Sequence, residues 1–462
     1  MGSEPVPSRR DRDASATRPV RIGAGAGYSG DRIEPAIDLV ERGRLDYLVF
    51  ECLAERTIAN AQQQRSTVPD GGYDPFLDAR IRAVLNPCRR NGTRIISNMG
   101  AANPLAAARR VREIAVDLGH PDIVIAAVTG DDVLAACRTQ DVALDNGLTV
   151  GVLGDRIISA NAYLGAGPIA EALAAGADVV ITGRVGDPSL FLGPLIHEFG
   201  WSLKDWSSLG KGTLVGHLLE CAGQICGGYF ADPGYKDVPG MAQLGFPFAD
   251  VAFDGTAEIG KLDGTGGRID AATVKEQILY EIHDPALYFQ PDVVADFSRV
   301  SVAETGPDRV RVSGACGSPR SGTLKVSVSY HDGYVGEGQI SYAGPGAVAR
   351  GRLALEIVRE RLANASALKD ARYELIGVDS LHGTKFGQDR DPYEVRARVV
   401  ARAAARVDAE RIGNEVEALY TNGPAGGGGA FKSVRQAVAL ASALIDESLA
   451  TPTVTLLQGE FA

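Results

Sequence analysis

Short apolar runs alternate with amphipathic segments from about residue 20 to residue 190. Each run is followed by a polar loop that contains glycine, and then by apolar residues at helical spacing. This alternation predicts right-handed βαβ units and a mostly parallel sheet. Because the runs are continuously apolar, we expect helices on both faces of the sheet, as in a doubly wound α/β fold. The predicted strands are 20–25, 45–51, 93–98, 122–128 and 177–183.

The pattern changes toward the C-terminal part of the chain. Residues 309–342 alternate in polarity between turn-forming sequences, which predicts antiparallel β structure. Further on we expect a helix from Ser433, in SVRQAVALASALIDESL, and a last strand in TVTLLQ. We therefore predict a disordered tail at 1–19, a large α/β domain at 20–365 and a small α+β domain at 370–462.

Composition narrows the class of function. The chain has 462 residues, 45% of them hydrophobic, with a net charge of −11 and a pI of about 5.2. This acidic balance argues against a nucleic-acid surface, which would need a basic stripe. No apolar run approaches the roughly 18 residues of a membrane span, and the polar start does not resemble a secretory signal. We expect a cytoplasmic protein with a small-molecule ligand, no membrane partner and, as a base-rate expectation, a homo-oligomeric state.

Candidate chemistry lies at the strand ends, because ligands of open α/β sheets bind there. After the first strand, GAGAGYSGDR contains Gly25, Gly27 and Gly30 at the G-x-G-x-x-G spacing, with Ser29 between them. Three interpretations stay open. The loop is a tight turn with a helix cap, an anion loop for the phosphates of an acyl-CoA, or a dinucleotide site in which Glu51 would bind the ribose.

The ends of the second and third strands supply further candidates. Glu51 could act as a catalytic acid or base, and Arg56 could bind a substrate carboxylate. Asn98 and Asn103 could hold a carbonyl or an oxyanion, although both also suit capping and turns.

The fifth predicted strand ends in TGRVGDPSL, the densest group of polar residues. Arg184 could bind a carboxylate or phosphate, Asp187 could be the base, and Thr182 and Ser189 could contact substrate. The alternative is an internal pair between Arg184 and Asp187, with Ser189 as a helix cap. No metal motif is present, so we predict no metal site and no firm cofactor, with a CoA thioester as a possible substrate.

The stretch NGPAGGGGAFKS resembles a phosphate loop, but Phe431 stands where the second glycine of that motif should be. We interpret it as a loop that precedes the helix expected from Ser433. Gly427 and Gly428 would then let the backbone approach a ligand closely.

Several long strings are similar to one family. SNMGAANP, ITGRVGDPSLFLGPLIHEFGW, TGGRIDAATVKEQILYEIHDPALYFQPDVVADFS and TNGPAGGGG resemble the AtuA family of acyclic terpene utilisation proteins. The resemblance runs from about residue 20 to the end of the chain. It implies a large N-terminal part with a small C-terminal α+β domain, and a place in metabolism that passes through branched acyl-CoA intermediates. It assigns no catalytic residue.

These observations together favour an enzyme acting on a branched carboxylic acid or its CoA thioester, by hydration, dehydration or a related lyase step. Asp187 or Glu51 would be the base, Asn98 and Asn103 would hold the enolate, and Arg184 or Arg56 would anchor a carboxylate. A hydrolase or acyl transferase, a non-catalytic acyl-CoA-binding subunit and an NAD-dependent oxidoreductase are the alternatives.

Overall fold

The computed structural model describes residues 18–383, 386 and 391–458. The predicted disordered tail at 1–19 falls almost entirely outside these residues. The chain folds into two compact units. The first holds the residues up to Val152, Ser159–Val328 and the residues from Ala441, and the second holds Leu153–Ile158 and Ser329–Leu440.

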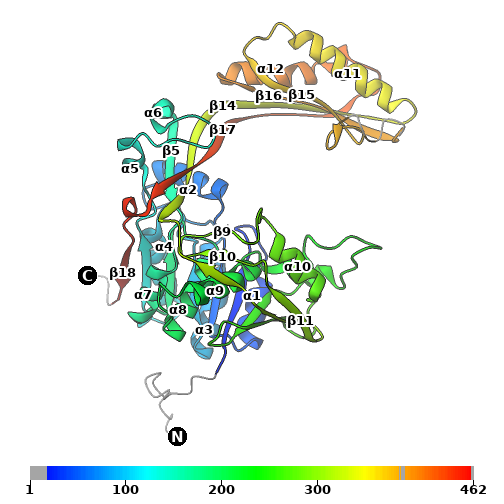
Figure 1. The fold of residues 1–462 in the computed structure, drawn as a ribbon. Helices are drawn as coiled ribbons and strands as arrows, with labels where there is room; N and C mark the ends of the chain where they lie inside the picture. Colours follow the sequence, from blue (N-terminus) through cyan, green and yellow to red (C-terminus); the bar gives the residue numbers. More distant parts are fainter. Residues whose placement is uncertain (1–17, 384–385, 387–390, 459–462) are drawn as a thin grey trace. The chain divides into compact units, whose positions relative to one another are not determined.

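A ten-stranded sheet forms the centre of the first unit, in the order β11-β12-β8-β7-β1-β2-β3-β6-β4-β18 (Figure 1). Its five central strands are parallel, and their buried apolar residues confirm the strands expected from the apolar runs. These strands are β1 (Val20–Ala26), β2 (Tyr47–Phe50), β3 (Arg94–Ser97), β6 (Val179–Thr182) and β4 (Ile125–Thr129).

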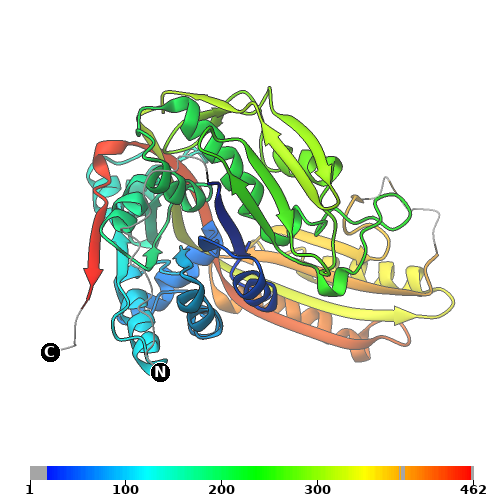
Figure 2. The same ribbon diagram turned by 90° about the horizontal axis from the view of Figure 1, so that it is seen from below.

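Antiparallel strands extend the sheet on both sides, so the prediction of a mostly parallel sheet is wrong outside the centre. The α/β class is confirmed as a mixed one. Strand β7 pairs antiparallel with β1 and is followed by β8, β12 and β11, while β18 pairs antiparallel with β4 at the other edge (Figure 2). Short connections such as the turn at 252–256 allow antiparallel pairing, whereas a parallel pair needs a long crossover. The added strands are β7 (Pro247–Val251), β8 (Ala257–Lys261), β12 (Arg309–Ser313), β11 (Ser301–Gly306) and β18 (Thr453–Leu457).

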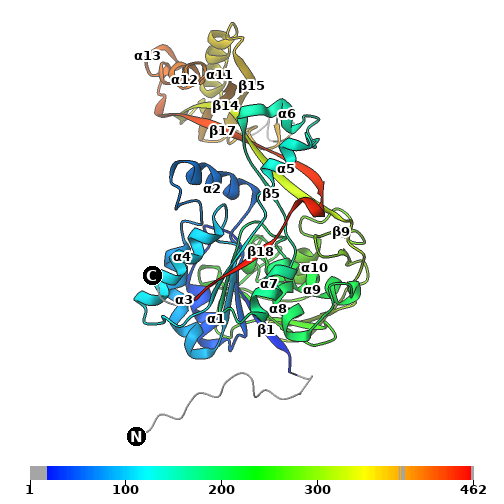
Figure 3. The same cartoon turned by 90° about the vertical axis from the view of Figure 1, so that its left-hand side faces the viewer.

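Helices cover both faces of the sheet, with α1, α3 and α4 on one side and α7, α8 and α9 on the other (Figure 3). Helix α4 shows why such segments are helical. Asn103 caps its first turn, proline occupies its first position, and Val111 and Ile114 lie on its buried face. The helices of this unit are α1 (Glu34–Arg42), α2 (Glu55–Thr67), α3 (Leu77–Asn91), α4 (Pro104–Asp117), α5 (Leu134–Thr139), α6 (Val150–Leu153), α7 (Gly167–Ala174), α8 (Ser189–Phe199), α9 (Trp206–Leu219) and α10 (Ala271–Leu279).

A smaller sheet in the first unit joins β9, β10 and β13, which are Tyr288–Phe289, Val294–Asp296 and Cys316–Ser318.

In the described part of the chain, no helix is long and apolar enough to cross a membrane.

The second unit packs α11 (Ala347–Leu362) and α12 (Arg406–Glu417) against a sheet ordered β15-β16-β14-β17. Strand β5 (Ile157–Ala162), of which only the first two residues belong to this unit, pairs with β14. Its core comes from alternate residues of β16, such as Val395 and Val399, and from the buried faces of the helices. The remaining elements are β15 (Leu368–Ile376), β16 (Glu394–Ala403), β14 (Thr323–Ala343), β17 (Gly428–Asp446) and α13 (Leu419–Asn422). The start of β14, up to Val328, and the end of β17, from Ala441, belong to the first unit.

Two details of the sequence prediction differ from the structure. The helix expected from Ser433 is instead strand β17, because this segment pairs along the edge of β14. The sequence pattern places the last strand in the small domain, but β18 belongs to the large sheet of the first unit. The predicted bounds 20–365 and 370–462 therefore differ from the bounds of the two compact units.

Candidate functional site

A cavity of about 1380 Å³ lies in the first unit, and we call it the main cavity. All the residues that line it belong to this unit. They come from the loops after β1, β2, β5 and β6, from the segments after α5, α9 and α10, from β9 and the residues after it, from the start of β14 and from the end of β17. Of the residues predicted from the sequence, Gly27, Glu51 and Asp187 line it.

Glu51 follows β2 and is buried at the wall of the main cavity. Its Oε1 accepts hydrogen bonds from the side-chain amide of Asn98, at 2.8 Å, and from the backbone N–H of Leu53, at 2.9 Å. Burial raises the pKa of Glu51, against the opposing charge of Arg184 and the hydrogen bond from Asn98. Asn98, predicted as an oxyanion donor, therefore holds Glu51 in place, and its own Oδ1 accepts from Cys52 N–H at 2.7 Å.

Glu220 is a second buried carboxyl at the wall of the main cavity, and no sequence motif pointed to it. Nε2 of His217 lies 2.9 Å from the carbonyl oxygen of Gln277, which can only accept, so Nε2 carries a proton. Nδ1 of His217 lies 3.0 Å from Oε1 of Glu220, so one proton lies between these two atoms. Burial raises the pKa of Glu220, with the contact to His217 opposing this effect.

Glu220 influences the ionisation of Glu51. The negative charge of Glu220 adds to the burial that raises the pKa of Glu51. Two neighbouring buried carboxyl groups favour a state in which one is ionised and the other protonated. The partners favour an ionised Glu51, because it accepts two hydrogen bonds. They favour a protonated Glu220, because it shares a proton with His217.

A third polar group of the main cavity consists of Glu55, Tyr163 and Lys325. The hydroxyl of Tyr163 donates to Oε1 of Glu55 at 2.6 Å, and Nζ of Lys325 donates to the same oxygen at 3.0 Å. Burial alone would raise the pKa of Glu55, but these hydrogen bonds outweigh it and lower the pKa to about 2. Glu55 is therefore a carboxylate at neutral pH.

Arg184 is a buried structural cation rather than a lining residue. Its guanidinium donates to the carbonyl oxygens of Val185 and Leu53 and pairs with Asp187. Its Cζ also lies 4.3 Å from the ring centroid of Tyr163. The internal pair that the sequence left open as an alternative is thus present, and Asp187 reaches the main cavity with its charge already paired.

Four of the other predicted residues do not line the main cavity. Thr182 is buried at the end of β6, and Ser189 donates to Oδ2 of Asp292 at 2.6 Å. Asn103 caps α4 and donates to the carbonyl oxygens of Pro69 and Gly71. Arg56 is exposed on α2. Substrate contacts by these residues stay sequence predictions.

In the glycine loop after β1, backbone N–H groups already bond to a carboxylate of the loop itself, that of Asp31. Asp31 accepts from the backbone N–H of Gly27 at 3.0 Å and from that of its neighbour Arg32 at 2.8 Å. The buried guanidinium of Arg80 donates to the carbonyl oxygens of Ser29 and Asp31. The carboxylate of Asp31 thus occupies the amides that a phosphate would need, which favours the tight-turn interpretation over a phosphate or dinucleotide loop. Gly25 and Gly30 face the rings of Phe50 and Tyr28.

Gly27 has a packing role that can be tested. A Cβ at this position would lie 2.5 Å from the backbone carbonyl carbon of Cys221, so one of the two segments would have to move. We expect Gly27→Ala to lower the free energy of unfolding by about 1–3 kcal/mol, measured by urea denaturation. Gly167→Ala is the matched control, since its Cβ would meet only Leu203, at 3.6 Å. Equal stability of the two variants would contradict the close packing at Gly27.

Gly427 and Gly428 belong to the second unit and precede or begin β17. A Cβ at Gly427 would approach the side chains of Ile340 and Tyr342, whereas a Cβ at Gly428 would meet nothing. The predicted role of these glycines at a ligand stays a sequence prediction.

Negative charge dominates the main cavity. Among the described residues that line it, only Arg32 and Lys325 are cations. The carboxyl residues of the lining are Asp31, Glu51, Glu55, Asp145, Asp187, Glu220 and Glu281. This excess disfavours a ligand whose anionic groups enter deeply. In the described part of the chain, no three His, Cys, Asp or Glu residues form a group that could hold a metal ion.

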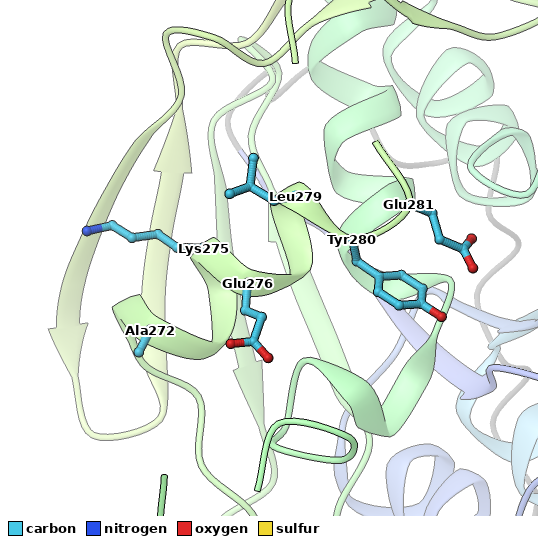
Figure 4. A pocket seen from close by; sticks show the side chains of 6 residues that line it. All are labelled: Ala272, Lys275, Glu276, Leu279, Tyr280 and Glu281. Atoms are coloured by element: carbon cyan, nitrogen blue, oxygen red, sulfur yellow. The ribbon is translucent and has the colours of Figure 1, made fainter. Parts of the chain in front are cut away.

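The end of α10 contributes Tyr280 and Glu281 to the main cavity. Figure 4 shows both side chains directed away from Lys275, and both also line a second depression along α10, together with Ala272, Lys275, Glu276 and Leu279. Burial and the neighbouring Glu281 raise the pKa of Tyr280 to about 12, which keeps its hydroxyl protonated as a donor. Glu281 has a φ of 59°, a conformation that non-glycine residues seldom adopt.

Asp131, which bonds to the backbone of Arg184, makes the free energy of unfolding depend on pH. It accepts from the backbone N–H of Arg184 at 3.0 Å and from Asn161 at 2.9 Å, and burial raises its pKa to about 6. The folded protein therefore binds this proton more tightly than the unfolded chain does. The contribution to stability is full below about pH 4 and is lost as pH rises to about 6.

We therefore expect Asp131→Asn to flatten the fall in unfolding free energy between about pH 4 and pH 6. The comparison uses urea midpoints of both proteins at several pH values, so that other titrating groups cancel. Parallel curves for the two proteins would contradict the role of Asp131.

Sequence reasoning missed Glu220, His217, Tyr163 and Lys325. The His217–Glu220 pair has a local signal, because residues three apart on a helix lie on the same face. Tyr163 and Lys325 have none, since their contact joins segments more than a hundred residues apart, through Tyr163 N–H and the carbonyl oxygen of Lys325 at 2.9 Å.

The comparisons with known proteins add one match. The family model described as acyclic terpene utilisation family protein AtuA matches residues 20–456. Neither the curated proteins nor the solved structures gave a match.

Proposed function

The chain belongs to the acyclic terpene utilisation family AtuA, and on this premise we propose that it is an enzyme acting on a branched carboxylic acid derivative. The proposed reaction is the addition or elimination of water next to a carbonyl group, as in a hydratase or dehydratase. The proposed substrate is a thioester such as a CoA derivative, because the acidic lining of the main cavity disfavours a free carboxylate.

The observation that carries this proposal is the pair of buried carboxyl groups, Glu51 and Glu220, at the wall of one cavity. Each carboxyl group is held by its own partners. No described residue donates to Oε2 of Glu51, and Oε2 of Glu220 has no hydrogen-bond partner among the described residues. Each group thus has one oxygen that no described protein donor occupies, and that of Glu220 is buried. Acid–base catalysis requires such a pair, with pKa values moved toward neutrality by the environment.

The two groups suit opposite roles. In the direction of elimination, ionised Glu51 would take the proton from the carbon next to the carbonyl. Protonated Glu220 would give its proton to the departing hydroxyl, which leaves as water. In the direction of hydration, Glu220 would take a proton from the attacking water and Glu51 would return one to carbon. His217 would position Glu220 and supply or accept the shared proton.

The alternative of a covalent acyl transfer has less support. Burial raises the pKa of the Cys221 thiol, and the charges of Glu220 and Glu51 raise it further, so the thiolate is disfavoured. The hydroxyl of Ser189 donates to a carboxyl group, that of Asp292, and not to a histidine.

Solvent exchange tests the proposal directly. We expect the purified protein, incubated with 3-hydroxy-3-methylbutanoyl-CoA in D₂O, to remove the NMR signal of the protons next to the thioester. Release of free CoA instead would favour the hydrolase alternative. A raised melting temperature with the thioester but no exchange would favour a non-catalytic binding subunit.

A cytoplasmic location, a homo-oligomeric state and the absence of nucleic-acid and membrane partners stay predictions from the sequence.

A further inference from the structure

We propose that Lys325, held by Glu55 and Tyr163, is the group that binds and polarises the substrate carbonyl in the main cavity. This inference rests on the proposed function and adds to it the donor that would stabilise an enolate. It assigns a role to a cluster that no motif in the sequence indicated.

The position of Lys325 suits a carbonyl-binding group. Lys325 lies at the start of β14 and lines the same cavity as Glu51 and Glu220. Its side chain is 46% exposed, although the backbone around it is held by the hydrogen bond from Tyr163 N–H. An ammonium group thus reaches the cavity from a fixed strand.

The surroundings of Lys325 fix its charge and its direction. Its Nζ donates to Glu55 at 3.0 Å and lies 4.9 Å from the ring centroid of Tyr163. Burial alone would lower the pKa of Lys325, but the nearby oxygens of Tyr163 and Glu55 raise it. The ammonium group therefore stays protonated at neutral pH. Ser327 also donates to the hydroxyl of Tyr163, at 3.3 Å, which fixes the ring.

Lys325 retains donors that a ligand can use. An ammonium group has three N–H donors, and Glu55 takes one of them. Arg32, the other cation of the lining, is directed to the carbonyl oxygen of Leu244 at 3.3 Å and to Glu34 at 3.6 Å. Among the described lining residues, Lys325 is therefore the cation best placed to meet a developing oxyanion.

The donors expected from the sequence have other partners. The amide of Asn98 donates to Glu51, and the amide of Asn103 donates to Pro69 and Gly71. Abstraction of a proton next to a carbonyl places negative charge on the carbonyl oxygen, and this charge needs a fixed donor in a site with so many carboxylates. Lys325 supplies a positive charge for this purpose.

A chromophoric probe separates polarisation from binding. Conjugated thioesters absorb at longer wavelength when a donor polarises the carbonyl group, so cinnamoyl-pantetheine reports on the electrostatic field around its carbonyl oxygen. We expect a red shift of the probe in wild-type protein, little or none in Lys325→Met, and most of the wild-type shift in Lys325→Arg. Lys204→Met, which removes an exposed lysine outside the cavity, should leave the shift unchanged.

The solvent-exchange rate gives a second readout. We expect kcat for exchange of 3-hydroxy-3-methylbutanoyl-CoA to fall about 100-fold in Lys325→Met, with a smaller effect on KM. Thermal melting of each variant verifies that it is folded. If Lys325→Met does not fold, the comparison of Lys325→Arg with wild type still tests the proposal.

The outcomes separate this inference from the proposed function. A Lys325-dependent red shift without exchange would support carbonyl binding and reject the hydratase function. Exchange with a red shift that is equal in wild type and Lys325→Met would reject the role of Lys325 and leave the function standing. Failure of wild-type protein both to bind the probe and to exchange the CoA thioester would reject both.

Discussion

Replacement of Glu51 by glutamine should lower the rate of solvent exchange by about 10²–10⁴-fold, the range expected for loss of a general base. The structure makes this a selective change. Oε1 of Glu51 accepts both of its hydrogen bonds, from Asn98 and Leu53, and the amide oxygen of glutamine can accept the same two. The variant thus loses the negative charge and keeps the local geometry.

Stability provides the control for this experiment. Burial of an ionised carboxyl costs free energy, so Glu51→Gln should melt at the wild-type temperature or above. Glu171→Gln, on the exposed side of α7, removes a carboxylate outside the main cavity and should exchange at the wild-type rate. A Glu51→Gln protein that keeps more than a tenth of the wild-type rate would remove Glu51 from the mechanism.

Replacement of Arg184 by methionine should destabilise the folded protein by about 3–5 kcal/mol, as expected when one partner of a buried charged network is removed. The guanidinium is fully buried and donates to the carbonyl oxygens of Leu53 and Val185. Methionine fills much of the volume but leaves these oxygens and Asp187 without their donor. The loss should appear as a lower urea midpoint with an unchanged slope.

The same substitution distinguishes the structural role of Arg184 from the substrate-anchoring role predicted by the sequence. Arg56→Met, on the exposed face of α2, is the matched control and should change stability by no more than about 0.5 kcal/mol. If Arg184→Met were as stable as wild type but bound thioester poorly, Arg184 would be a ligand-binding residue after all.

The central strands could be predicted because the residue pattern that specifies each strand lies within the strand itself. Each is a short run of apolar residues, such as YLVF in β2, that is buried on both faces and bounded by polar loops. The antiparallel flanks were not predictable as part of the same sheet. The pairing of β7 with β1 joins residues 229 positions apart, for example Arg21 and Asp250, and no local pattern encodes that choice.

Strand β17 shows how tertiary pairing overrides local propensity. Its segment is rich in alanine, leucine, glutamine and arginine, which favour helices, yet it runs as a strand from Gly428 to Asp446. Helix propensity is worth a few tenths of a kcal/mol per residue, whereas the long strand β14 offers backbone hydrogen bonds along much of this length. The half-exposed residues on both faces of β17 gave no alternating pattern that could correct the prediction.

The candidate site was predictable in part. The rule that ligands bind at the ends of parallel strands led to Glu51 and Asp187, and both line the main cavity. The rule cannot tell which polar side chains already have partners within the protein, so it also selects Asn98, Arg184 and Ser189, which bond to protein groups. Glu220 and Lys325 come from segments that follow no central strand, so the rule did not reach them.

The pairing of β18 with β4 also bears on the order in which the protein is made. Thr129 of β4 is bonded across the sheet to Thr453 of β18, and a ribosome adding about 5–20 residues per second needs about 15–65 seconds to synthesise the chain between them. During that interval the apolar edge of β4 has no strand beside it, and such an edge is prone to pair with another chain. The yield of folded protein in a cell should therefore depend on chaperones that cover nascent chains.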